Sequence, residues 1–65
     1  MDLGLNIKKA REAAGITQSQ LAEKLQVRQI EISRWENNNR TPNVLTFGRI
    51  CKVIGVSADK LLELV

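Results

Sequence analysis

Apolar residues recur along this chain at intervals of three and four residues, the spacing that places side chains on one face of an α-helix. Leu3, Ile7, Ala10 and Ala14 form the first such stripe, and Gly15 follows it, where a helix commonly ends. The sequence shows no sustained two-residue alternation of the kind that marks a half-buried strand. The pattern therefore predicts an all-α chain.

Two of the predicted helices are separated by very little chain, within TQSQLAEKLQVRQIEISRWE (residues 17–36). Thr17 and Gln20 fit a capping box, so the second helix is expected to begin directly after Thr17. Its apolar stripe is interrupted over residues 26–28, and a third helix is predicted over about residues 29–37.

The residues at this junction fit a helix-turn-helix. Two helices that cross steeply after a turn of about three or four residues need a small side chain where their backbones approach. Ala22 fits that position, and Val27 supplies an apolar side chain for the turn. Ile32 and Trp35 then form the inward stripe of the third helix.

The second half of the chain predicts two more helices. Asparagines at residues 37–39 end the third helix, because asparagine tolerates the left-handed conformation. Thr41 and Pro42 predict the start of the fourth helix, as a capping hydroxyl followed by proline at the first helical position. That helix is expected to reach Ile54, and Ser57 is expected to cap a short fifth helix.

Composition narrows the possible functions. The 65 residues predict a single domain over residues 1–65, and one cysteine with no histidine excludes an internal disulfide and the usual zinc sites. We expect no cofactor, metal or enzyme activity, since no histidine can activate Cys51. The absence of a signal peptide and of a long apolar run predicts a soluble, cytoplasmic protein that does not enter a membrane. A net charge of +3 is compatible with a polyanionic partner, and equally with an ordinary solvated surface.

Several spaced motifs resemble the phage repressor and Cro type of helix-turn-helix proteins, also called the xenobiotic response element family. The motifs are IKKAREAAGITQSQLAEKL, ISRWE, TP and IGVSADKLLEL, and they extend from Ile7 to Leu62. The resemblance implies a five-helix lambda-repressor-like fold that binds double-stranded DNA in a transcriptional regulator, with residues 29–37 in the major groove. Two positions depart from the family pattern: Gln26 replaces the usual turn glycine, and Arg28 replaces the Ser or Thr that often precedes the third helix.

The outward face of the third helix carries side chains suited to DNA bases. Gln29 can both donate to and accept from adenine, Arg34 can donate twice to guanine, and Ile30 fits a thymine methyl group. Ser33 is expected to contribute little, and Arg28 can reach either a base or a phosphate. The alternative is that this polar face is only solvated surface.

Phosphate contacts are expected from the start of the second helix and from the loop after the third. The candidates are Gln18, Asn37, Asn39, Arg40, Thr41 and Asn43, with Arg40 the strongest electrostatically, although a loop of this composition can also be a plain connection. The family resemblance adds a structural ion pair between Arg11 and Glu36, which would fix the third helix against the first and can also aim Arg11 at a phosphate.

The resemblance also implies a homodimer through the fifth helix and the loop before it, because two recognition helices about 34 Å apart are needed for specific binding. Val56, Leu64 and Val65 can supply that surface, or can belong to a frayed end or the edge of the core. The chain end fits a small Cro-like or restriction-controller protein, and equally the N-terminal piece of a longer repressor. A rival function is a protein-interaction module, such as an antitoxin or a transcriptional bridging factor.

Overall fold

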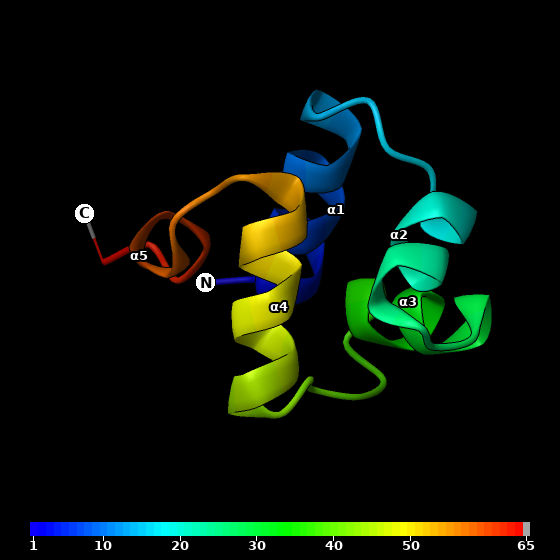
Figure 1. The fold of residues 1–65 in the computed structure, drawn as a ribbon. Coiled ribbons are helices and arrows are strands. Elements are labelled where there is room, and N and C mark those ends of the chain that lie inside the picture. Colours follow the sequence, from blue (N-terminus) through cyan, green and yellow to red (C-terminus); the bar gives the residue numbers. More distant parts are fainter. Residues whose placement is uncertain (65) are drawn as a thin grey trace.

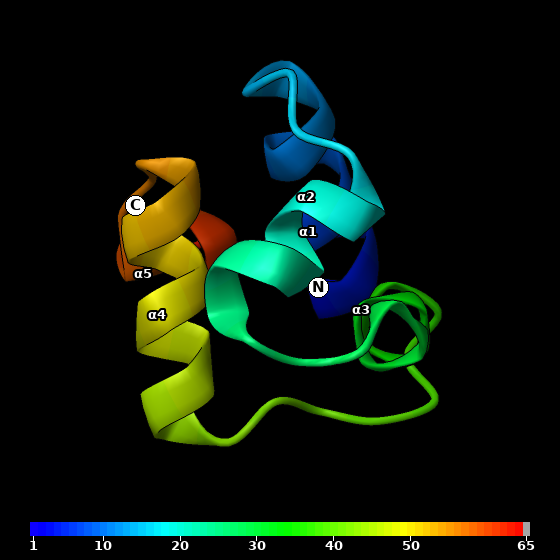
Figure 2. The same ribbon diagram turned by 45° about the vertical axis from the view of Figure 1, so that its right-hand side comes forward.

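The computed structural model describes residues 1–64, which form five helices and contain no strand, so the predicted all-α class is confirmed. The helices are α1 (Leu3–Ala13), α2 (Gln18–Leu25), α3 (Gln29–Glu36), α4 (Val44–Ile54) and α5 (Ala58–Leu61). Helices α2 and α3 lie on one side of α1 and α4, and the short α5 lies on the opposite side (Figures 1 and 2). This arrangement leaves α3 and α5 far apart.

The junction between α2 and α3 forms as the sequence predicts. The Thr17 hydroxyl accepts from the Gln20 amide at 3.1 Å, and the Gln20 side chain accepts from the Thr17 amide at 2.9 Å, which completes the capping box. Gln26 ends α2 with φ of 58°, the left-handed conformation that glycine adopts more easily. Arg28 precedes α3 without a side-chain capping bond. At both departures from the family pattern the structure thus shows a less favourable local arrangement: a left-handed glutamine at Gln26 and an uncapped helix start at Arg28.

The predicted start of α4 is wrong by two residues, about half a helical turn. Asn43, rather than Thr41, is the N-cap, because its side-chain oxygen accepts from the Thr46 amide at 2.9 Å. Pro42 lies buried in the loop before the helix and does not occupy its first position. Asparagine caps helices at least as well as threonine, and it stands closer to the apolar stripe of α4.

Two smaller expectations also need correction. α3 ends at Glu36, with Asn37 as its C-cap, so the helix is one residue shorter than predicted. Ala14 is exposed and not part of the inward stripe, because α1 ends at Ala13 and the chain turns through Gly15. The other predicted helix ends agree, including Gly55 with φ of 84° after α4 and Ser57 as the N-cap of α5.

The core is built from one face of each helix. Its largest fully buried side chains are Ile7, Leu21, Leu25, Ile32 and Ile50, each stabilising the fold by roughly 2 kcal/mol on burial. Trp35, Phe47, Leu61 and Cys51 complete the cluster, and burial raises the pKa of the Cys51 thiol, which keeps it protonated. Within residues 1–64, each helix is too short or too polar to cross a membrane.

Candidate nucleic-acid interface

The outward face of α3 is open to solvent over its first turn. Arg28, Gln29 and Ile30 are exposed, and Ser33 and Arg34 are half-buried one turn further along. Ile30 is 47% exposed, although its side chain is aliphatic and it stands beside polar neighbours. An exposed aliphatic group is unfavourable in water, so its position suits contact with another apolar surface.

Arg34 has a partner that the sequence interpretation missed. Its Nη1 lies 3.2 Å from Glu31 Oε1, and the two side chains remain 42% and 29% exposed. An exposed pair at this spacing contributes only about 0.5 kcal/mol or less, whereas a bidentate contact with a base is worth roughly 1–3 kcal/mol. Arg34 can therefore leave Glu31 for a base. Opposite charges three residues apart on a predicted helix were the signal for this pair.

A buried ion pair joins α1 to the end of α3. Arg11 Nε lies 2.6 Å from Glu36 Oε2, Nη2 donates to Glu36 Oε1 at 3.1 Å, and Nη1 donates to the Ile16 carbonyl at 2.8 Å. The two side chains are only 9% and 2% exposed, and the hydrogen bond that Arg11 donates to Glu36 raises the pKa of Arg11. The structure thus contains the Arg11–Glu36 pair, and its geometry fixes α3 against α1.

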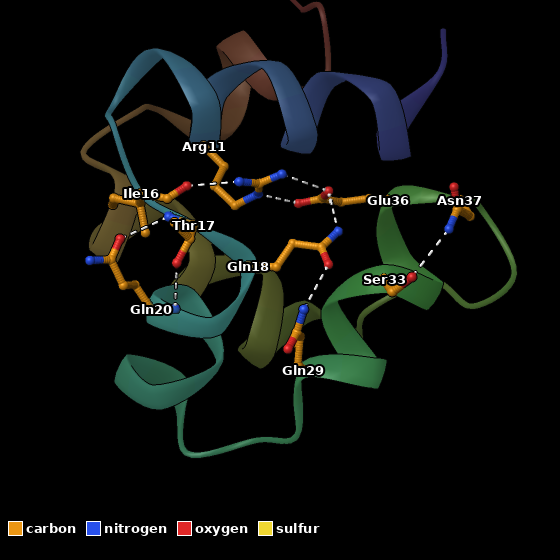
Figure 3. Close-up of polar contacts among 9 residues, drawn as sticks. All are labelled: Arg11, Ile16, Thr17, Gln18, Gln20, Gln29, Ser33, Glu36 and Asn37. Carbon is orange, nitrogen blue, oxygen red and sulfur yellow. Dashed lines mark hydrogen bonds and ion pairs between the residues drawn. The ribbon is translucent and has the colours of Figure 1, made fainter.

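A line of side-chain hydrogen bonds leads from this ion pair to the exposed face of α3 (Figure 3). Gln18 Nε2 donates to Glu36 Oε1 at 2.9 Å, and Gln18 Oε1 accepts from Gln29 Nε2 at 3.4 Å. The Ser19 hydroxyl donates to Gln29 Oε1 at 3.0 Å, a contact that the sequence did not indicate. The first residues of α2 and α3 are therefore linked through their side chains.

The predicted phosphate contacts lie at helix ends and in the loop between α3 and α4. Gln18 begins α2, where the first backbone N–H groups lack acceptors within the helix. Asn37, at the end of α3, donates to the Ser33 hydroxyl at 3.3 Å. The other candidates are exposed: Asn39, Arg40 and Thr41 in the loop, and Asn43 at its end. The side-chain oxygen of Asn43 accepts the hydrogen bond that caps α4, so its NH₂ group is the part that can donate to a phosphate.

The start of α1 is attached to the end of α3 by contacts that the sequence did not reveal. The Asn38 side chain accepts from the Gly4 amide at 2.9 Å and donates to Asp2 Oδ1 at 2.7 Å. The hydrogen bond from Asn38, and then that from the Leu5 amide, lowers the pKa of Asp2. Asn38 adopts φ of 61°, which aims its side chain back at α1. No local pattern indicates such a contact across 34 residues.

Comparison with known proteins gives the family of this chain. The helix-turn-helix family model HTH_3 matches residues 7–61. The HTH-type transcriptional regulator ImmR of Bacillus subtilis is 39% identical over 62 residues, which cover 95% of this chain and 49% of ImmR. The HTH-type transcriptional activator BcrR of Enterococcus faecalis is 36% identical over 63 residues, which cover 97% of this chain and 31% of BcrR. The chain thus spans about half the length of one relative and a third of the other.

The fold of this chain is also similar to that of a protein with a solved structure. SinR, described as the master regulator for biofilm formation and solved in complex with DNA, matches with a TM-score of 0.84 and 34% sequence identity. The match covers 92% of this chain and 97% of that chain, which agrees with the expected lambda-repressor-like fold. All three relatives are named as regulators or an activator, and none as an enzyme. This chain therefore belongs to the HTH_3 helix-turn-helix family, the Cro/C1 type predicted from its motifs.

Proposed function

We propose that this chain, as one domain over residues 1–65, binds double-stranded DNA sequence-specifically in a transcriptional regulator. The observation that carries the proposal is the outward face of α3, where polar side chains and the half-exposed Ile30 follow the turn of a helix-turn-helix. Its family membership, the DNA-bound state of the SinR neighbour and the net charge of +3 support the same function. A DNA partner also favours the cytoplasmic location expected from the sequence.

Each base-contacting candidate has a definite chemical role in this proposal. Gln29 reads an adenine through one donor and one acceptor, Arg34 reads a guanine through two donors, and Ile30 covers a thymine methyl group. Ser33 adds a short-range contact near the middle of α3. Arg28, at the N-cap, lies where it can reach a base edge or the neighbouring phosphate.

The backbone contacts position α3 in the groove. The start of α2 offers Gln18 and the positive end of a helix dipole to one phosphate. Arg11 is buried beside Glu36, so its contribution is to hold α3 in place. The loop after α3 supplies the remaining proposed donors, which are Asn37, Asn39, Arg40, Thr41 and Asn43.

The proposal includes a homodimer formed through α5 and the loop before it. α5 lies on the opposite side of α1 and α4 from α3, so two copies joined at α5 keep both recognition helices accessible (Figures 1 and 2). Val56 is half-buried in the loop before α5, and Leu64 is 70% exposed after it. Val65, the third residue expected at this surface, lies outside the described residues.

Fluorescence anisotropy with a duplex selected from a random pool, beside an unselected duplex, tests the proposal at several salt concentrations. We expect the selected site to be two-fold symmetric and to bind at least about 10³-fold more tightly than the unselected duplex at physiological salt. Gln29→Ala and Arg34→Ala should each weaken only the selected duplex, by roughly 1–3 kcal/mol. Lys52→Ala, which removes an exposed charge from α4, is the matched control for Arg34→Ala.

Weak binding that is equal on both duplexes and lost at physiological salt would overturn the proposal and favour a protein-interaction module. Dimerisation is tested separately with Leu64→Asp, which places a charge on an exposed position. This variant should lose tight binding to the two-half-site duplex but keep the binding of a single half-site. If Leu64→Asp bound the two-half-site duplex as tightly as the wild type does, and the single half-site equally well, the proposed dimer surface would be contradicted.

A further inference from the structure

We infer that Glu36 sets the direction of the hydrogen bonds of Gln29, through Gln18, and thereby contributes to the selection of adenine at the base that Gln29 reads. The inference rests on the proposed function and adds a positioning residue to it. The Glu36 side chain is only 2% exposed, so its influence on a base must pass through other side chains.

In the buried ion pair, each partner has only one hydrogen-bonding role. An ionised carboxylate can only accept hydrogen bonds, and a guanidinium can only donate them. Two Arg11 nitrogens donate to Glu36, one to each carboxylate oxygen, so both oxygens act as acceptors. Glu36 Oε1 is therefore an acceptor whose direction cannot be reversed, and Gln18 Nε2 lies 2.9 Å from it.

The second step is the orientation of the Gln18 amide. An amide carries a donor at one end and an acceptor at the other, and in water it can turn end for end. Beside Glu36 only one orientation forms a hydrogen bond, because the reversed amide would place its own oxygen against the carboxylate. Gln18 Oε1 consequently faces Gln29 as an acceptor.

The third step transfers this direction to Gln29. Gln29 Nε2 donates to Gln18 Oε1 at 3.4 Å, a long contact, and Gln29 Oε1 accepts from the Ser19 hydroxyl at 3.0 Å. A hydroxyl can either donate or accept, so Ser19 holds the amide in place without choosing its direction. The direction is chosen by Glu36, the one member of the line that can only accept.

The fixed direction leaves Gln29 with one N–H and one oxygen lone pair for the major groove. Adenine offers an acceptor at N7 and a donor at N6, which complements this pair, whereas guanine offers two acceptors. A Gln29 amide free to turn would spend part of its time with the wrong group toward each position. The restraint should therefore raise the preference for adenine without adding any contact to DNA.

The test uses the selected duplex and the position whose base preference is lost in Gln29→Ala. The measured quantity is the ratio of dissociation constants for guanine, or 7-deazaadenine, against adenine at that position. We expect a ratio of about ten for the wild type, since a bidentate contact discriminates by this order. Glu36→Gln and Gln18→Leu should lower it toward the Gln29→Ala ratio. A general loss of affinity or stability cancels in the ratio.

Glu31→Gln is the matched control, because it makes the same chemical change on α3 at a residue outside this line of hydrogen bonds. It should keep the wild-type ratio. If Glu36→Gln fails to fold, Gln18→Leu decides, since it leaves the Arg11–Glu36 pair in place. An unchanged ratio in the folded variants, with the ratio lost in Gln29→Ala, overturns the inference and leaves the proposed function standing. If selection from the duplex pool yields no preferred site, both the inference and the proposed function are overturned.

Discussion

Replacing Gly4 with alanine would press a methyl group against the end of α3. A Cβ at this position would lie 2.5 Å from the Glu36 carbonyl oxygen, 2.6 Å from that of Trp35 and 2.7 Å from Asn38 Oδ1. The two nearest atoms belong to the backbone and cannot move aside independently. Overpacking of this kind typically costs about 1–3 kcal/mol, and the hydrogen bond from the Gly4 amide to Asn38 would be strained as well.

Helix propensity predicts the opposite sign for the same substitution. Alanine is favoured over glycine by up to about 1 kcal/mol inside a helix. The clash should outweigh this gain, so we expect Gly4→Ala to lower the free energy of unfolding by about 1–2 kcal/mol. In a domain of this size, that change corresponds to a fall in Tm of roughly 4–16 °C. Urea and thermal denaturation followed by circular dichroism would measure both quantities.

Gly48 provides the matched control, because it is also helical but exposed, and a Cβ there would meet nothing within 4 Å. Gly48→Ala should therefore raise the free energy of unfolding by about 0.5–1 kcal/mol. The two substitutions are chemically identical and should have opposite signs. An equal or greater stability of Gly4→Ala relative to wild type would refute the close contact between α1 and α3.

Three further substitutions test the polar contacts and the turn. Arg11→Met should lower the free energy of unfolding by about 3–5 kcal/mol, because it leaves the Glu36 charge buried without its partner. Urea denaturation would measure this loss. The double variant Arg11→Met/Glu36→Leu should recover most of it. Gln26→Gly should raise the Tm, since relief of the left-handed conformation is worth up to about 1 kcal/mol, and an unchanged or lower Tm would argue against strain there. The Asp2 carboxylate has a pKa below its ordinary value of 3.8, so its contribution is present above that value and lost as the pH falls through the lowered pKa. The stability difference between wild type and Asp2→Asn should therefore shrink in acid, and a difference that stays constant from neutral pH to about pH 2 would contradict the contact with Asn38.

Much of the candidate interface could be located from local patterns. The capping box at Thr17 placed α2, and the phase of Ile32 and Trp35 separated the two faces of α3. That separation gave the outward residues of α3, and the helix-turn-helix motif before them was needed to propose that they contact bases. The start of α4 was misplaced because Thr41 and Asn43 are both acceptable caps, and only the geometry of the chain selects between them.

The contacts that orient α3 have a different origin. The helix-turn-helix is determined within residues 17–36, where helical periodicity and the turn act on neighbouring side chains. The attachment of Asn38 to Gly4 and the bond from Gln18 to Glu36 join residues that are 34 and 18 positions apart. Their donors and acceptors have no fixed spacing in the sequence, and they meet only when the helices pack. The sequence by itself determined which helices form and which face of α3 is polar, whereas the tertiary structure decided how α3 is held and how its side chains are directed.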